Sequence, residues 1–411
     1  MGMGKDHRQR QRSAACGVRI LTAWFGLWAL APVGPALAAG VERCLDSLQA
    51  REAVLVSAPS GRAVAARNEA LGCVPASTLK ILTAFAAIHE MGLDYRFPTD
   101  AFIDRSGNLI IEGRGDPLLT SESLAQFARR LAGQVSEFND LVLDDTYFDE
   151  HILISGRGGS TNPYDAPVGA LCANFNTVCV RRDGQGRLVS AEPETPLIPF
   201  AREKVRALGV REGRITFTHE RSEATYYAGH LLEYFLEAEG CRMRGTVRRG
   251  PVPEGAERVL RFDSPFTLET VLQRMLEFSN NFVANQVFIG MGARRYGAPG
   301  TVSKGVRVME DVASNVLRLE GLQVAEGSGL SRENRVTPLQ MIRILDAFAP
   351  YRNLLRKKPG MLFKTGTLSG VRNLAGYLEG QNGGYYAFAV FLGPSGGRLD
   401  GIMDCIRQGL P

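Results

Sequence analysis

Short runs of apolar residues, separated by turn residues, predict strands near both ends of the chain. Residues 53–57 and 62–66 are joined by a Pro-Ser-Gly turn, which predicts a two-stranded hairpin. Residues 361–363, 373–378 and 385–392 are also strand-like, and a Gly-rich turn separates the last two, which predicts an antiparallel meander. We therefore expect one sheet that both ends of the chain complete.

Longer apolar patterns between these ends predict helices. Residues 77–91 are almost continuously apolar, follow Pro75 and stop at Gly92, which is typical of a buried helix with defined ends. Helical spacing of apolar residues also covers residues 267–278, 282–291 and 338–348. Helices packed on an antiparallel sheet indicate an α/β (α+β) fold.

The middle of the chain has a different residue pattern. It mixes short strand-like and helical patterns with many Gly, Pro and Arg residues. The predicted strands are 109–111, 141–143 and 215–217, and the predicted helices are 121–131 and 228–239. We interpret residues 93–262 as an insert with its own small core, and residues 40–92 and 263–411 as one main domain.

The N-terminus has the pattern of an export signal. Five cations precede or enter an apolar run at residues 20–31, which is shorter than a membrane span needs, and the run ends at Ala36-Leu37-Ala38. We expect residues 1–38 to be a signal peptide, cut after Ala38 or Ala39, with an uncleaved anchor as the alternative. The mature protein would then have no stable membrane span and would lie outside the cytoplasm.

Removal of the leader changes the net charge that the mature protein carries. The chain of 411 residues is 45% hydrophobic and 22% charged, which is typical of a folded globular protein. Its net charge is +5, but the leader carries five cations and one anion, so about +1 remains on the mature chain. The basic character is therefore no evidence for a nucleic-acid partner.

Six of the seven cysteines follow the leader, an even number in an oxidising compartment. Cys172 with Cys179, or Cys44 with Cys405, could pair, whereas free buried thiols are the alternative, and the sequence leaves the connectivity open. No His has metal-ligand spacing with another His or Cys, and no phosphate-binding Gly motif stands out, so we expect neither a metal nor a cofactor.

Ser77 and Lys80 are candidates for nucleophilic chemistry. On a helix that starts at Ser77, Lys80 lies three residues on and therefore on the same face, where its amine can take the proton of the hydroxyl. The positive end of the helix dipole favours negative charge on the hydroxyl oxygen. A Ser-x-x-Lys pattern is common by chance, and a capping Ser with a solvent-facing Lys is the alternative.

Two later motifs add possible partners for this pair. Ser279 and Asn281 fall between two helical stretches, where a turn would present both side chains to a cleft or would merely cap a helix. Lys364 lies on a strand-like run, where it could hold a carboxylate while the glycine that follows lets a ligand approach closely. The expected catalytic residues are Ser77, Lys80, Ser279, Asn281 and Lys364, and the expected substrate-binding residues are Thr365, Gly366 and Thr367.

Ser-x-x-Lys, Ser-x-Asn and Lys-Thr-Gly in this order form the set shared by β-lactamases and penicillin-binding proteins. The chain resembles the insert-bearing D-Ala-D-Ala carboxypeptidase/endopeptidases, the type-four penicillin-binding proteins. The first two motifs are 202 residues apart and the last two 85, which agrees with an insert and argues against a compact β-lactamase. Further matches to the family lie at residues 113–117, 144–149, 164–170, 174–176, 327–332 and 334–338.

The resemblance implies a penicillin-binding protein/β-lactamase-like transpeptidase fold and a role for each motif residue. Ser77 would attack the penultimate D-Ala carbonyl with Lys80 as base, and the backbone N–H groups of Ser77 and Thr367 would hold the oxyanion. Ser279 would relay a proton to the leaving amine, Asn281 would hold the substrate amide, and Lys364 would bind the terminal carboxylate or support proton transfer.

The same resemblance implies a penicillin-sensitive, periplasmic serine carboxypeptidase and/or endopeptidase. Its partners would be peptidoglycan stem peptides and, as covalent inhibitors, β-lactam antibiotics; a homodimer is a further partner that we consider. Two alternatives stay open, a β-lactamase or esterase with the same motifs, and a non-catalytic cell-wall-binding protein. The insert is short for the family, and residues 183–218 look trimmed.

Overall fold

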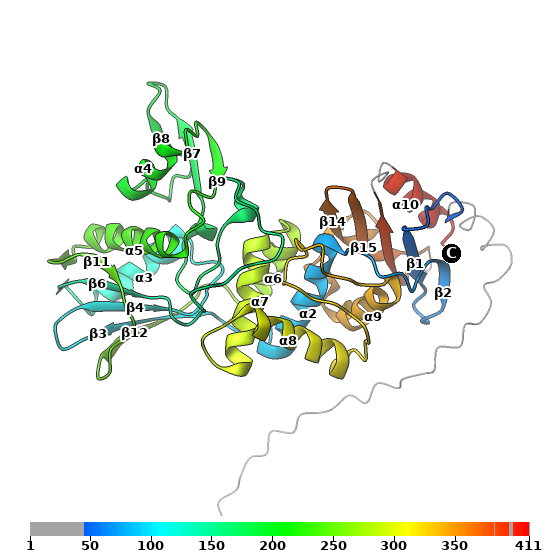
Figure 1. The fold of residues 1–411 in the computed structure, drawn as a ribbon, viewed down its shortest axis with the longest axis horizontal. Coiled ribbons are helices and arrows are strands. Elements are labelled where there is room, and N and C mark those ends of the chain that lie inside the picture. Colours follow the sequence, from blue (N-terminus) through cyan, green and yellow to red (C-terminus); the bar gives the residue numbers. More distant parts are fainter. Residues whose placement is uncertain (1–44, 382, 394–397, 411) are drawn as a thin grey trace, which may run out of the picture.

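The computed structural model describes residues 45–381, 383–393 and 398–410 (Figure 1). The predicted signal peptide, residues 1–38, lies outside them. Within the described ranges, every helix is too short or too polar to cross a bilayer. The molecule is elongated, with a helix-and-sheet body at one end and a second sheet with its own helices at the other (Figure 1).

One sheet contains both ends of the described chain, as predicted. It has six strands in the order β13-β14-β15-β16-β1-β2. Its neighbouring strands are all antiparallel, so the predicted hairpin and meander are confirmed. The strands are β1 (Ala53–Ser57), β2 (Ala63–Arg67), β13 (Arg356–Lys358), β14 (Met361–Leu368), β15 (Val371–Glu379) and β16 (Tyr385–Leu392).

Both faces of this sheet are buried. Ala53 and Leu55 of β1 face the core beneath the helices, whereas Val54 and Val56 face a second core under α10 (Leu399–Gln408). Successive side chains of a strand point to opposite faces, so a strand covered on both faces must be apolar at almost every position. This explains the unbroken apolar run of β16, where seven of eight residues are buried.

The helices of this body surround α2, which carries the first motif. A 3-10 turn, η1 (Ala76–Leu79), leads into α2 (Lys80–Met91), so the predicted helix at 77–91 is present with a tighter first turn. α2 is buried along most of its length. The helices packed around it are α6 (Leu268–Glu277), α7 (Asn281–Tyr296), α8 (Val302–Asp311) and α9 (Pro338–Phe348).

The middle of the chain forms a second sheet with a separate core. Its order is β11-β6-β4-β3-β12, and α3 (Ser121–Ala132) and α5 (Arg221–Ala238) pack together over it (Figure 1). The strands are β3 (Pro98–Ile103), β4 (Leu109–Gly113), β6 (Leu141–Asp144), β11 (Val247–Arg249) and β12 (Glu257–Asp263). The division into residues 40–92 with 263–411 and an insert of 93–262 stays a prediction, and the pairing of β3 with β12 agrees with it.

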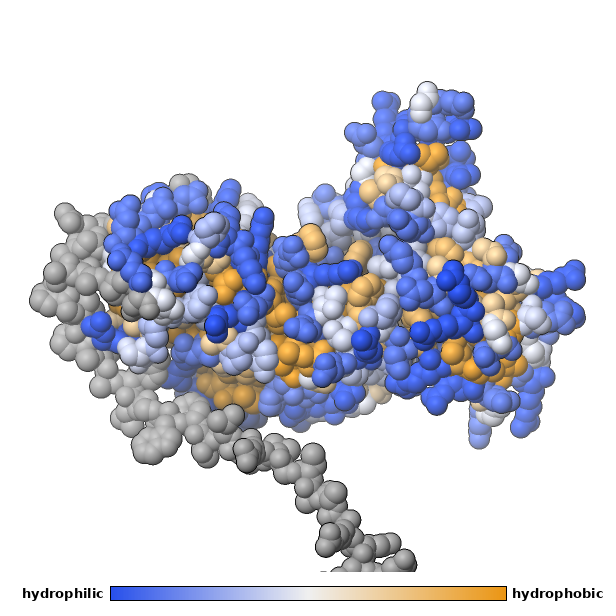
Figure 2. Space-filling view, turned by 180° about the vertical axis from the view of Figure 1, so that it is seen from behind, coloured by the Kyte–Doolittle hydropathy of each residue, from blue (hydrophilic) through white to orange (hydrophobic). Residues whose placement is uncertain are grey.

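A small three-stranded sheet projects from this second body (Figure 1). It consists of β7 (Val178–Arg182), β8 (Leu188–Ser190) and β9 (Gly213–Ile215), with α4 (Pro199–Ala207) beside it. Figure 2 shows that the tip of the projection is mostly hydrophilic. The predicted strand at 215–217 is wrong beyond Ile215, because the Thr216 N–H leaves the sheet and donates to the Thr161 carbonyl at 3.0 Å.

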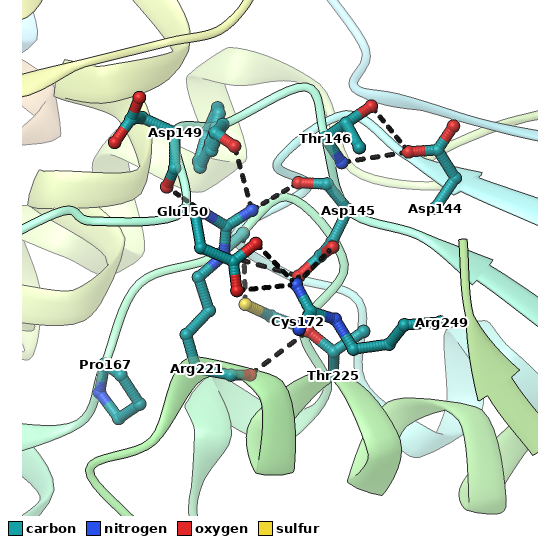
Figure 3. A network of polar contacts seen from close by, with 12 residues as sticks. Asp144, Asp145, Thr146, Asp149, Glu150, Pro167, Cys172, Arg221, Thr225 and Arg249 are labelled. Atoms are coloured by element: carbon teal, nitrogen blue, oxygen red, sulfur yellow. Dashed lines mark hydrogen bonds and ion pairs between the residues drawn. The ribbon is translucent and has the colours of Figure 1, made fainter. Parts of the chain in front are cut away.

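A network of charged groups fixes the start of α5, which begins seven residues before the predicted helix at 228–239 (Figure 3). The Arg221 guanidinium donates to the carbonyl oxygens of Asp145, Phe148 and Asp149. Thr225 Oγ1 donates to the buried Asp145 carboxylate at 2.9 Å. The early turns of α5 are therefore held by tertiary contacts that apolar periodicity cannot indicate.

The cysteines do not follow the shorter predicted pairing. Cys172 and Cys179 are both free thiols, as are Cys73 and Cys241, so a bridge between residues 172 and 179 is wrong. Cys172 Sγ instead contacts the Gly169 carbonyl, and Cys179 lies on β7 opposite Arg214. Cys405 is disulfide-bonded, whereas Cys44, its predicted partner, lies outside the described residues.

One buried side chain joins α7 to the middle of the chain. The Gln286 amide donates to the Gly169 carbonyl at 2.9 Å and accepts from the Gly169 N–H at 3.1 Å. Gln286 is fully buried, so both bonds are shielded from water. The helix that begins with Asn281 is therefore fixed from both bodies.

Two glycines of α7 should respond in opposite ways to substitution by alanine. A Cβ on Gly292 would lie 2.7 Å from the Gly305 backbone N of α8, whereas a Cβ on Gly290 would lie 3.7 Å from Phe97 and fit. We expect Gly292→Ala to lower the free energy of unfolding by about 1–3 kcal/mol through overpacking. Gly290→Ala should raise it by about 0.5–1 kcal/mol through helix propensity. Urea denaturation measures both, and equal effects would contradict this packing.

Candidate active site

The first motif forms a contact at the start of the central helix. Lys80 Nζ lies 3.0 Å from Ser77 Oγ, as the three-residue spacing predicts. Ser77 is partly exposed, but Lys80 is completely buried, so the alternative of a solvent-facing lysine is wrong. Ala76, just before the serine, has φ = 48°, an uncommon conformation for a residue with a side chain. The turn therefore exposes the hydroxyl while the amine stays inside.

Two carbonyl groups complete the surroundings of the Lys80 amine. Its Nζ donates to Asn281 Oδ1 at 2.7 Å and to the Ser328 carbonyl oxygen at 2.7 Å. Asn281 comes from the second motif, 201 residues away along the chain. The structure thus brings the first two predicted motifs together around one nitrogen atom.

The second motif also meets the third. Lys364 Nζ donates to Ser279 Oγ at 2.8 Å and to the Thr365 carbonyl at 2.8 Å. Between Ser279 and Asn281, the Asn280 side chain caps α7 by accepting from the Val283 N–H at 3.1 Å. Asn280 therefore does the capping, which leaves the other two side chains for contacts with Lys364 and Lys80.

The third motif lies on a strand with a partly open edge. β13 pairs with β14 at Met361–Phe363, and among the described residues no strand pairs with that edge at 364–368. Thr365 and Thr367 are exposed there. A Cβ on Gly366 would lie 2.6 Å from the Pro75 carbonyl oxygen, so glycine is required for β14 to pass this close to the serine turn. All the predicted site residues therefore lie within one connected region.

Three further residues shape the site and were absent from our predicted set. The Asn373 amide donates to the carbonyls of Val74 and Pro75 at 2.8 and 2.9 Å, which fixes the segment before Ser77. Ser328 supplies the carbonyl on Lys80, and the buried Glu326 carboxylate accepts from the Ser328 N–H. For Ser328, membership of the family-like stretch at 327–332 was the available signal. Nothing in the local sequence marks the other two.

Burial and like charge act on both amines. Burial lowers the pKa of Lys80 well below its ordinary value, the nearby Lys364 ammonium lowers it further, and Glu326 acts in the opposite direction. Burial, together with Arg356, lowers the pKa of Lys364 to about 8. In the described part of the chain, no group of three or more His, Cys, Asp or Glu side chains is placed to hold a metal ion. A neutral amine at Lys80 is thus favoured beside a Lys364 that is still charged near neutral pH.

The role of Arg356 in the charge of Lys364 can be measured directly. Arg356→Gln should raise the pKa of Lys364 from about 8, because a like charge is removed. Lys357→Gln, on the next residue of β13, is the matched control and should leave that pKa in place. Lysine-selective NMR titration follows both variants. A Lys364 pKa that does not rise in Arg356→Gln would contradict this assignment of the cause.

The chain is similar to two curated bacterial enzymes over most of its length. It is 28% identical to a D-alanyl-D-alanine carboxypeptidase of Actinomadura sp. strain R39, covering 86% of this chain and 79% of that protein. It is 25% identical to the D-alanyl-D-alanine carboxypeptidase DacB of Haemophilus influenzae, covering 82% and 84%. The similarity therefore extends through the middle region as well as the body that holds the motifs.

Solved structures share the fold. Penicillin-binding protein 4 of Haemophilus influenzae superposes with a TM-score of 0.70 at 21% identity, covering 86% of this chain and 93% of that one. The predatory endopeptidase Bd0816 of Bdellovibrio bacteriovorus gives a TM-score of 0.52 at 17% identity, covering 87% and 92%. These likenesses confirm the predicted fold class of penicillin-binding protein type.

The family model covers nearly the whole described chain. The model of the D-Ala-D-Ala carboxypeptidase 3 (S13) family matches residues 41–357 and 355–401. These two matches include the turn of Ser77, the start of α7 and the strand of Lys364. They confirm the predicted enzyme class, a serine D-Ala-D-Ala carboxypeptidase. The chain belongs to the D-Ala-D-Ala carboxypeptidase 3 (S13) family.

Proposed function

We propose that this protein hydrolyses D-Ala-D-Ala-type bonds in peptidoglycan stem peptides through an acyl-enzyme on Ser77. The observation that supports this most directly is the buried Lys80 amine, 3.0 Å from the Ser77 hydroxyl and 2.7 Å from each of two carbonyl oxygens. Such a pair is the nucleophile and base that acyl transfer requires. We place the mature enzyme in the periplasm, on the evidence of the leader and of bacterial relatives.

The direction of the Lys80 lone pair supports its role as base. A neutral amine has two N–H groups and one lone pair. If the N–H groups donate to Asn281 Oδ1 and the Ser328 carbonyl, the lone pair faces the remaining neighbour, Ser77 Oγ. The amine can then take the hydroxyl proton as Oγ attacks the carbonyl carbon.

The substrate would lie along the open edge of β14. An extended peptide can add to such an edge through backbone hydrogen bonds. Its carbonyl oxygen would accept from the N–H groups of Ser77 and Thr367, which stabilise the negative charge that develops during attack. Its terminal carboxylate would lie against the Lys364 ammonium or the exposed Thr365 hydroxyl.

Breakdown of the tetrahedral intermediate requires a proton for the leaving amine. The Lys80 ammonium would supply it as the C–N bond breaks, and we assign the relay to Ser279 by the family resemblance; Ser279 Oγ lies 2.8 Å from Lys364 Nζ, beside the site. Water then attacks the ester carbon, Lys80 takes a proton from this water, and Ser77 Oγ leaves and regains its proton. The enzyme returns to its starting form, with one peptide bond hydrolysed.

β-Lactams are proposed as covalent inhibitors on the same serine. A penicillin presents the carbonyl of its β-lactam ring and a carboxylate on the fused ring, and these could occupy the oxyanion site and the Lys364 site. A structure of the Haemophilus penicillin-binding protein 4 with a β-lactam bound supports this proposal by analogy of fold. Endopeptidase action has comparable support from Bdellovibrio endopeptidases of the same fold. The homodimer stays a prediction that sedimentation velocity can test.

Labelling with fluorescent penicillin tests the nucleophile. The wild-type protein should form a long-lived adduct, and Ser77→Ala should abolish it, since among the described residues Ser77 supplies the hydroxyl that contacts Lys80 Nζ. Ser303→Ala, an exposed serine on α8, is the control and should label normally. Rapid turnover of the label would instead favour a β-lactamase, and absence of wild-type label a non-catalytic protein. Digestion of purified muropeptides then separates carboxypeptidase from endopeptidase products.

The two lysines should give a bell-shaped pH profile of kcat/KM. Activity should rise with pH as Lys80 loses its proton, because its pKa is lowered and only the neutral amine is a base. It should fall above about 8, where Lys364 loses the charge that holds the carboxylate. Lys364→Arg should move the alkaline limb to higher pH. An alkaline limb that stays in place in Lys364→Arg would contradict this role.

A further inference from the structure

A buried carboxylate closes the turn whose carbonyl oxygen accepts from the Lys80 amine. Glu326 is completely buried, and its two oxygens accept four hydrogen bonds. Two come from Ser328, through its N–H at 2.7 Å and its hydroxyl at 2.5 Å. The others come from the Ser331 N–H at 3.3 Å and the Asn334 amide at 3.0 Å.

The direction of these bonds indicates that Glu326 is an anion. The Ser328 hydroxyl oxygen accepts from the Leu330 N–H at 3.3 Å, so its hydrogen points to Glu326. With N–H donors at both oxygens, a proton on either oxygen would face another donor. The turn at Ser328 is therefore closed around one negative charge.

Every backbone group of residues 327 and 328 has a partner inside the protein. The Gly327 N–H donates to Asn285 Oδ1 at 2.9 Å, and the Gly327 carbonyl accepts from Thr83 Oγ1 at 2.6 Å. The Ser328 N–H donates to Glu326, and the Ser328 carbonyl accepts from Lys80. Among the described residues, Glu326 alone accepts from both the N–H and the hydroxyl of Ser328, so this carboxylate sets where the carbonyl on Lys80 lies.

The next residue, Gly329, packs this turn against the backbone just before Ser77. Gly329 has φ = 81°, and a Cβ there would lie 1.8 Å from the Ala76 carbonyl oxygen. The turn held by Glu326 therefore lies directly against the residue before Ser77. A displaced turn would move both the acceptor on Lys80 and the backbone of the serine.

We propose that Glu326 is a positioning residue for the reaction: it holds the Ser328 carbonyl so that the Lys80 lone pair faces Ser77, and it supplies a negative charge near the base. The proposal rests on the proposed function. Two charged groups face Lys80 in the described residues, Lys364 from β14 and Glu326 from this turn, and they act on it in opposite directions. The negative charge of Glu326 thus offsets part of the lowering of the Lys80 pKa, in a base that must both take up and release a proton in each half of the cycle.

The test compares Glu326→Gln with wild type in the pH dependence of acylation by a chromogenic cephalosporin. Loss of the anion should lower the pKa of Lys80, so the acid limb should move to lower pH, by about one unit as for other nearby charges. Loss of two of the four bonds should also lower the plateau about tenfold, since small misplacement of a base is costly. A merely structural glutamate would change the plateau but leave the acid limb in place.

Asp165→Asn is the matched control. Asp165, the last residue of a short 3-10 turn, is also buried and lies in the predicted insert. It accepts from the backbone N–H groups of Gly158 and Ser160 and from the Ser160 hydroxyl. It should keep the wild-type acid limb. Glu326→Asp serves where Glu326→Gln does not fold: it should keep the acid limb and lower the plateau about tenfold through its shorter reach.

Each outcome separates this proposal from the proposed function. A wild-type protein that is not acylated at all overturns the proposed function. Normal wild-type acylation with an unmoved acid limb in a folded Glu326→Gln overturns the role of Glu326 alone, as does a shift that Asp165→Asn reproduces. A plateau rate in Glu326→Asp equal to that of wild type would also overturn the role of Glu326. Circular dichroism confirms that each variant is folded.

Discussion

The amine of Lys80 is the constraint on which the rest of the site depends. A lysine with no exposure to water strongly disfavours its charged form, so it can serve as a base near neutral pH. Burial alone would leave polar hydrogens without partners, and the carbonyl groups of Asn281 and Ser328 satisfy them. The same two contacts orient the free electron pair. The same contacts therefore allow Lys80 to be buried, satisfy its N–H groups and point its lone pair at Ser77.

The fold serves this arrangement by bringing distant segments to one point. α2, α7, β14 and the turn at residues 326–329 each contribute one group, and the side chains of Lys80 and Lys364 join these segments because the backbones pack closely. Gly366 and Gly329 both lie against the residues immediately before Ser77. A Cβ on either glycine would collide with a backbone carbonyl oxygen there. The middle region takes part in this packing, since Gln286 fixes α7 to Gly169 and Ser155 Oγ contacts Ser331 Oγ at 2.8 Å.

Residues whose role follows from local spacing could be predicted, and residues whose role follows from closure of the fold could not. Ser77 with Lys80 lies within one helical turn, and Lys364 lies on a recognisable strand. Asn373 acts through the distant carbonyls of Val74 and Pro75, which leaves no local pattern. Glu326 binds its own turn, and it gains a role in the site only because the fold brings the Ser328 carbonyl of that turn to Lys80. The start of α5 could not be predicted for the same reason, because Arg221 and Thr225 are polar and are held in the helix by hydrogen bonds to Asp145. The sequence left open whether Cys172 and Cys179 pair or stay free, because the neighbours of each depend on the fold; β7 places Cys179 opposite Arg214.

We propose that groups from these segments act together on a single carbonyl carbon. A crystal structure of the protein after reaction with penicillin tests it most directly. We expect an ester on Ser77 Oγ, the acyl oxygen between the N–H groups of Ser77 and Thr367, and the ligand carboxylate against Lys364 or Thr365. An adduct on another residue, or an acyl oxygen turned away from both N–H groups, would contradict it.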